Sequence, residues 1–177
     1  VRIGATELPA LLTVLGSIGL VEGAEAAVRG GAATADITLR GVPADPEITA
    51  EASIDRLAAD RITVPSARVS VSSRARAPAL DFIVTAPAAT VEGQRLDNIR
   101  STGRLDGSFL RLHEVAVAQP DGAGRVLANG TYDRSSGAYT FSADGSGWLI
   151  AAAEGQPVSG IATLRVKGGG TIEDPRA

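Results

Sequence analysis

Residues Ala33–Arg40 read A-T-A-D-I-T-L-R, an unbroken alternation of apolar and polar side chains. Outward from this stretch the same alternation recurs at Glu47–Asp55, Ala67–Ser72, Glu114–Gln119, Arg125–Tyr132 and Tyr139–Ala143. A period of two residues is typical of β-strands with one face buried and the other in water. The pattern predicts an all-β protein.

Glycine, proline and acidic residues separate these stretches. They cluster at Gly41–Pro46, Asp106-Gly107, Asp121–Gly124, Asp133–Gly137 and Asp144-Gly145. We interpret the Asp-Gly pairs as hairpin turns, and their spacing of roughly 8–15 residues favours a meander or a solenoid. Helix is expected only near residues 9–15, where Pro9 suits a first turn and Gly16 an end. A buried strand is the alternative for that segment.

The composition argues against several classes of function. Seventeen Lys and Arg against 20 Asp and Glu give a net charge of −3, the wrong sign for a nucleic-acid partner. There is no Cys and a single histidine, so the chain offers no thiolate nucleophile, disulfide scaffold or histidine-based metal site. We interpret His113 as a solvated strand histidine beside Arg111, with Glu114 on the opposite face. The sequence therefore predicts no catalytic residue, metal or cofactor, and a protein that is not an enzyme.

The apolar face of the predicted strands is the main candidate site. Alternation assigns to it Ile37, Leu39, Ile48, Ile54, Val69, Val71, Phe82 and Val84. The same alternation turns Thr38, Arg40, Asp55, Arg68 and Ser70 toward water. Aromatic residues are only 3% of the chain, which is few for a closed sandwich core. Two interpretations remain open: an ordinary core of modest side chains, and an open apolar trough.

One internal repeat stands out. Residues Ala33–Pro46 and Ala162–Pro175 share their Ala, Thr, Gly and Asp-Pro positions at one constant offset of 129 residues. Long-period repeats are typical of stacked architectures. We expect residues 1–177 to be a single section of a repetitive β-structure, one unit plus the start of the next. The chain opens at Val1 without Met, which we interpret as an excised or processed segment.

Several of these stretches resemble the TamB family of envelope translocation and assembly proteins, within the AsmA-like and bridge-like lipid-transfer group. Asp36–Ile48 is similar to the family's strand, Gly, short turn, Pro, strand signature. Leu105–Leu112, followed by Ala128–Tyr132, is similar to its paired glycine-containing strands. Glu7–Leu12 resembles the short apolar helix that begins such units.

The resemblance implies a long twisted antiparallel sheet curled lengthwise into a U-shaped apolar groove, with one short N-terminal helix. It implies a periplasmic segment that carries phospholipid between inner and outer membranes, with an outer-membrane assembly protein as partner of the parent protein. The inner-membrane anchor of such a parent is absent from this chain. A structural β-module, or a scaffold that binds outer-membrane strands at the sheet edge, is the alternative.

Overall fold

The computed structural model describes residues 2–5, 28–42, 45–74, 77–150, 160–171 and 175–176. Its strands are β1 (Arg2–Ala5), β2 (Val28–Val42), β3 (Asp45–Ala59), β4 (Ile62–Arg74), β5 (Ala77–Val91), β6 (Gln94–Asp106), β7 (Phe109–Ala118), β8 (Arg125–Asp133), β9 (Ala138–Ile150), β10 (Gly160–Thr171) and β11 (Pro175–Arg176). A single 3-10 turn, η1 (Pro120–Gly122), is the helical element within these ranges.

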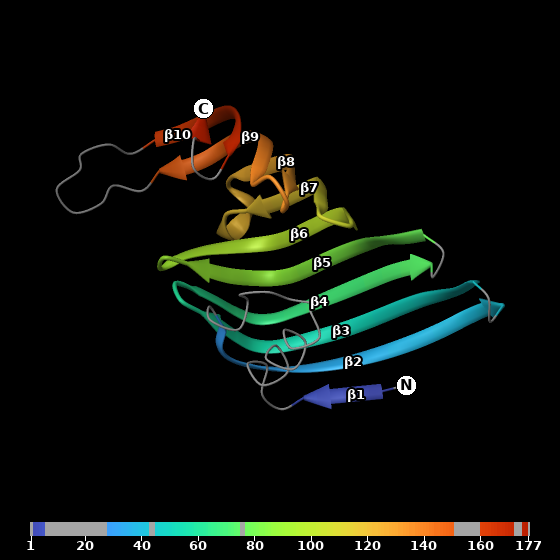
Figure 1. Ribbon diagram of the computed structural model, residues 1–177. Helices are drawn as coiled ribbons and strands as arrows, with labels where there is room; N and C mark the ends of the chain where they lie inside the picture. Colours follow the sequence, from blue (N-terminus) through green and yellow to red (C-terminus); the bar gives the residue numbers. More distant parts are fainter. Residues whose placement is uncertain are drawn as a thin grey trace.

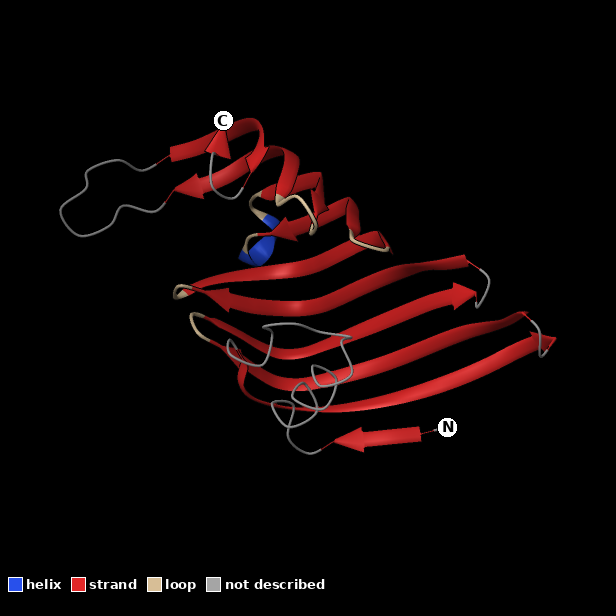
Figure 2. Ribbon diagram, viewed as in Figure 1, coloured by secondary structure: helices blue, strands red, loops and turns tan. Residues whose placement is uncertain are grey.

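All the strands belong to one antiparallel sheet whose spatial order is the order of the chain (Figure 1). Nine strands of 9 to 15 residues form its body, and the short strands β1 and β11 lie at its two edges. Figure 2 shows that strand dominates the described structure, with η1 beside the end of β7. The all-β prediction is confirmed. The helix expected near residues 9–15 lies outside the described residues.

Among the described residues, the predicted strands and turns agree with the structure except at Asp144-Gly145. The alternating stretches fall within β2, β3, β4, β7, β8 and β9, apart from Gln119, which follows the end of β7. The turn predicted at Asp144-Gly145 is wrong, because these residues lie inside β9 and pair with both β8 and β10. The turn predicted at Asp121–Gly124 lies in the connection of the β7–β8 hairpin, and it includes η1, where Gly122 N donates to Gln119 O at 3.1 Å.

Two tight turns are tied to neighbouring strands by ion pairs. Asp60 and Glu92 open these turns with φ of 41° and 52°, in the left-handed region that such hairpins require. Arg29 of β2 contacts Asp60 at 3.0 Å, and Arg61 contacts Glu92 at 2.6 Å. All four side chains are mostly exposed, so each pair contributes at most about 1 kcal/mol. Their effect is to hold successive hairpin ends together.

The buried side chain of Gln119 extends the sheet between the end of β7 and the start of β8. Gln119 is 8% exposed and lies between β7 and η1. Its Nε2 donates to Leu149 O at 2.8 Å, and its Oε1 accepts from Leu149 N at 2.7 Å. The side-chain amide thus makes the same two bonds to β9 that a strand residue would make. Sequence alternation gave no sign of this contact.

The side of β7 on which Glu114 lies differs from the prediction. In the ladder between β6 and β7, Glu114 pairs with Thr102 and Leu112 pairs with Gly103. His113 is therefore an extra residue on β7 between these two pairs. Such a bulge shifts the alternation by one residue, so Glu114 lies on the polar side instead of the opposite one. There it approaches Arg100 at 3.9 Å.

The described residues contain no thick core. The buried apolar side chains are five alanines, Ala33, Ala79, Ala86, Ala89 and Ala116, and no large side chain among these residues is fully buried. A closed sandwich instead buries large side chains from two facing sheets. The described strands therefore form one open layer.

Candidate functional site: one apolar face of the sheet

The strand register brings all eight predicted site residues to one face of the sheet. Opposed residues in an antiparallel ladder point to the same side, so each pairing fixes a shared face. The pairings that link the set are Leu39↔Ile48, Ile37↔Ala50, Ala50↔Val71, Ile54↔Ala67, Val71↔Phe82 and Val69↔Val84. We call the surface formed by these residues and their register partners the apolar face. The structure places the whole predicted set within β2–β5.

Exposure differs between the two sides of these strands. Seven of the eight residues are half-buried, and Leu39, near the end of β2, is 59% exposed. The residues predicted to face water are all exposed: Thr38, Arg40, Asp55, Arg68 and Ser70. The apolar face thus remains partly accessible, unlike a core.

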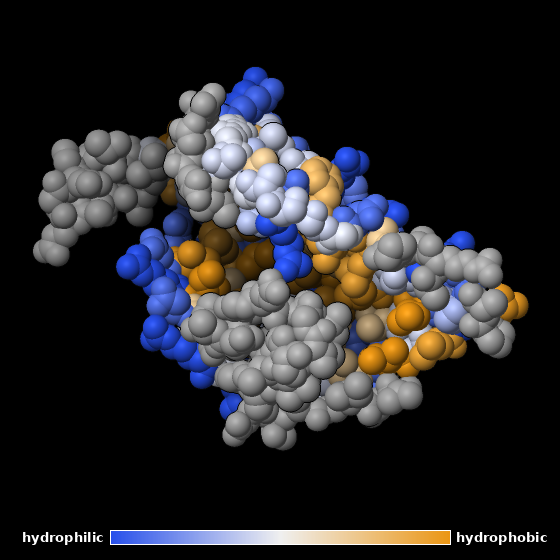
Figure 3. All heavy atoms as spheres, viewed as in Figure 1, coloured by the Kyte–Doolittle hydropathy of each residue, from blue (hydrophilic) through white to orange (hydrophobic). Residues whose placement is uncertain are grey.

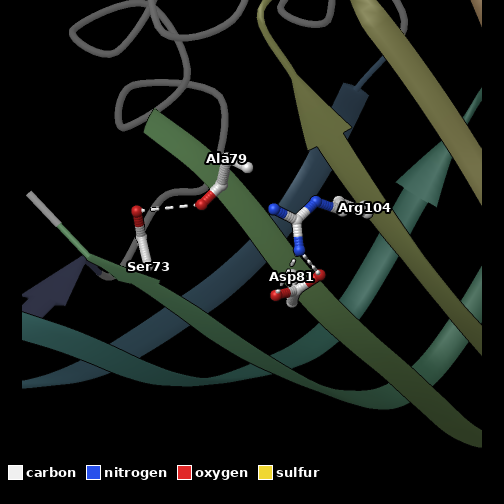
Figure 4. A network of polar contacts seen from close by, with 4 residues as sticks. All are labelled: Ser73, Ala79, Asp81 and Arg104. Carbon is white, nitrogen blue, oxygen red and sulfur yellow. Dashed lines mark hydrogen bonds and ion pairs between the residues drawn. The ribbon is translucent and has the colours of Figure 1, made fainter. Parts of the chain in front are cut away.

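Charged pairs lie on the opposite, polar side of the sheet. Arg104 of β6 contacts Asp81 of β5 at 3.4 Å, and Arg165 of β10 contacts Asp144 of β9 at 2.8 Å. Figure 4 shows the first pair, together with the bond of 3.1 Å from Ser73 Oγ to Ala79 O at the end of the β4–β5 hairpin. A one-residue slip would carry such charges onto the apolar face, at a cost of several kcal/mol.

The apolar face continues beyond the predicted residues onto β6–β9. An open pocket of about 330 Å³ lies over β7–β9, and the residues that line it are Leu110, Leu112, Val115, Ala128, Asn129, Gly130, Thr131, Tyr132, Tyr139, Thr140 and Phe141. The rings of Tyr139 and Phe141 stack with centroids 6.3 Å apart. Sequence analysis left the tyrosines out of the site. The sequence pattern could have included Tyr139, because it lies two residues from Phe141 on one strand and residues at this spacing share a face.

Glycine makes room for an aromatic ring on this face. Gly103 of β6 lies opposite Phe82 of β5. A Cβ atom at position 103 would lie 2.5 Å from the Phe82 ring and 2.6 Å from the carbonyl oxygen of Arg111. The ring therefore lies flat over the neighbouring strand, where only a glycine leaves the space.

The space-filling view agrees with this division of residues. Figure 3 shows apolar residues, in orange, in the recess of the visible face, and hydrophilic residues, in blue, along its outer margin. Apolar side chains also reach the right-hand margin of that view. The visible face therefore has an apolar recess.

Hydrogen bonds lower the pKa of one carboxylate at the margin of the sheet. Asp133, at the end of β8, accepts bonds from the Ser135 hydroxyl at 2.7 Å, the Ser135 N–H at 2.9 Å and the Ser136 hydroxyl at 2.9 Å. These bonds, led by that of the Ser135 side chain, lower its pKa to about 2. The carboxylate closes the β8–β9 turn and lies away from the apolar face.

In the described ranges, no three His, Cys, Asp or Glu side chains gather as a potential metal site. Nor does any helix there have the length and apolar character to span a bilayer. No protein-family model, curated protein or solved structure matches the chain.

Proposed function

We propose that the apolar face binds the acyl chains of phospholipids, and that the protein is a lipid-transfer segment of the TamB type. The observation that carries this proposal is the gathering of all eight residues on one face of an open sheet, where large apolar side chains stay partly accessible. An exposed apolar surface this extensive is typical of a binding site.

The energetics favour acyl chains as the ligand. Each methylene that leaves water gains about 0.8 kcal/mol, and a phospholipid brings many of them. Nine long strands about 4.8 Å apart extend the face over roughly 40 Å. Half-buried Ile, Val and Phe side chains offer contact without polar groups that binding would leave unpaired.

The proposal includes the curvature and setting implied by the family resemblance. The sheet curls lengthwise into a U whose interior is the apolar face, and the acyl chains lie along it with their head groups at the opening. The segment works in the periplasm, between the inner and outer membranes, with an outer-membrane assembly protein as partner of the parent protein. The twist of the sheet (Figure 1), the apolar recess of the visible face (Figure 3) and the greater exposure of the polar side of β2–β5 support this proposal.

A photo-crosslinking amino acid at two adjacent positions tests the proposal. Ile54 is half-buried on the apolar face, whereas Asp55 is exposed on the polar side. Position 55 is therefore a matched control with the same strand and depth along the sheet. In membrane-containing cells we expect phospholipid adducts at position 54 and none at position 55.

Two other outcomes would contradict the proposal. Equal labelling at both positions would show that lipid contact is not specific to the apolar face. A purified protein that is compact, monomeric and free of phospholipid by native mass spectrometry, with no adduct at position 54, would favour a structural β-module whose apolar face is its core.

A further inference from the structure

A row of register partners on the apolar face alternates large side chains with glycines. From β5 to β10 its members are Phe82, Gly103, Leu112, Gly130, Phe141 and Gly168. A glycine in a strand leaves room for a ring or a ligand to lie close to the backbone. At Gly103 the ring of Phe82 uses this room.

The room over Gly130 is not used in the same way. The three atoms nearest to a Cβ atom built there are the carbonyl oxygen of Thr140, at 2.5 Å, and Cα and Cβ of Phe141, both at 3.4 Å. None of them is a ring atom. The ring of Phe141 instead stacks on that of Tyr139, its neighbour on the same face of β9, with centroids 6.3 Å apart. The space over Gly130 therefore stays open.

The pocket of about 330 Å³ includes this space. Leu112 of β7 and Phe141 of β9 lie on either side of Gly130, and the pocket extends along β8 from Ala128 to Tyr132. This part of β8 is roughly 13 Å long, whereas β7 and β9 lie only about 10 Å apart. Because a side chain occupies each flank, the pocket is one hydrocarbon chain wide and runs along the strands.

The lining of the pocket suits an apolar chain. Among the described residues, those that line it include no charged side chain. Asn129, Thr131 and Thr140 lie at alternate strand positions, so their side chains turn to the polar side of the sheet. On the apolar face the pocket has Tyr132 and Tyr139 at one end and aliphatic side chains along its length. A charged or strongly polar ligand would find few partners there.

We propose that this pocket holds a single acyl chain of a phospholipid, lying along β8. The proposal rests on the proposed function and adds a fixed site to it. The pocket runs along the strands, at a right angle to the direction in which the apolar face extends from strand to strand. A chain in the pocket loses more of its surface to contact with the protein than a chain on the open face, so lipid is retained here longest.

The test uses the full chain and vesicles of phosphatidylethanolamine and phosphatidylglycerol. The vesicles contain a phospholipid with a photoreactive diazirine in one acyl chain, and mass spectrometry of the labelled peptides identifies the residues that this chain contacts. We expect the strongest labelling at Leu112, Tyr132 and Phe141. Ile54, on the apolar face of β3, reports lipid contact outside the pocket.

Two alanines that pair across β8 and β9 provide matched variants. Both are half-buried on the apolar face, but Ala128 lines the pocket and Ala143 does not. Ala128→Leu fills part of the pocket and should lower the labelling of Leu112 and Phe141 at least about fourfold, the effect of losing the burial of one methylene. Ala143→Leu should leave this labelling unchanged. Labelling of Ile54 should persist in both variants.

The labelling of Ile54 separates this proposal from the proposed function. Labelling of Ile54 without labelling in the pocket, or an equal loss of pocket labelling in Ala128→Leu and Ala143→Leu, would overturn the pocket as a site and leave the proposed function intact. Absence of labelling at both places would overturn both. If Ala128→Leu unfolds by circular dichroism, the wild type decides: stronger labelling at Leu112 and Phe141 than at Ile54 supports the proposal, and equal or weaker labelling overturns it.

Discussion

Replacing Gln119 by leucine tests whether a side-chain amide can stand in for a strand residue. The substitution keeps the volume but removes the bonds of 2.8 and 2.7 Å to the backbone of Leu149. A hydrogen bond contributes about 1 kcal/mol net, and burial at 8% exposure adds a penalty for the groups left without partners. We expect the free energy of unfolding to fall by about 2–3 kcal/mol in equilibrium urea denaturation.

The control is a hydrogen bond of similar length on the surface. Thr131 and Thr140 share a bond of 2.8 Å between their exposed hydroxyl groups, so Thr140→Val should change the stability by less than about 0.5 kcal/mol. A loss for Gln119→Leu no larger than this would refute the reasoning. Gln119→Glu supplies a second check, because its carboxylate lacks the donor that Leu149 O requires. Its deficit relative to the wild type should shrink as the pH falls through the carboxyl pKa of about 4.3.

Three further predictions follow from the same structure. The folded-state pKa of Asp133 is lowered to about 2, so the ionised carboxylate stabilises the fold above about pH 4 and this stabilisation is lost as the pH falls toward 2. A midpoint near pH 4 in an NMR titration of this carboxyl group would contradict the prediction. Gly103→Ala places a Cβ atom 2.5 Å from the Phe82 ring and 2.6 Å from the carbonyl oxygen of Arg111, and it should lower the free energy of unfolding by about 1–3 kcal/mol. An unchanged melting temperature would show that both the ring and this backbone can move apart. Ile54→Asp, on the open face, should cost about 1–2 kcal/mol and leave the fold intact by circular dichroism, whereas complete unfolding would indicate a closed core.

Period-two alternation predicted the strands and their shared face well, because both depend on local geometry. Each residue of a regular strand turns to the opposite side from its neighbour. Once adjacent strands pair in register, Ile37 and Phe82 must share a face although 45 residues separate them. The same reasoning predicted that Arg40, Asp55 and Arg68 face water, without any knowledge of the hairpins, and all three are exposed.

The predictions from alternation and turn composition were wrong where pairing with a neighbouring strand changes the local structure. The bulge at His113 depends on how β6 and β7 align, and a single sequence does not show that alignment. Asp144-Gly145 has the composition of a turn but pairs on both sides within β9. The contact of the Gln119 side chain was not predicted because its partner, Leu149, is 30 residues away in the sequence. In each case a tertiary contact overrides the local preference.

The identity of spatial order and chain order has a kinetic consequence. In the described structure each long strand pairs with the strands that precede and follow it in sequence. The formation of each ladder therefore requires no strand that is distant in sequence. Closing a short loop costs little entropy, and folding rates rise as contacts become more local. The sheet can therefore grow one hairpin at a time from the end of the chain that is free first. A stall in synthesis would leave a shorter sheet in which the strands already made have their native order, with one unpaired edge exposed.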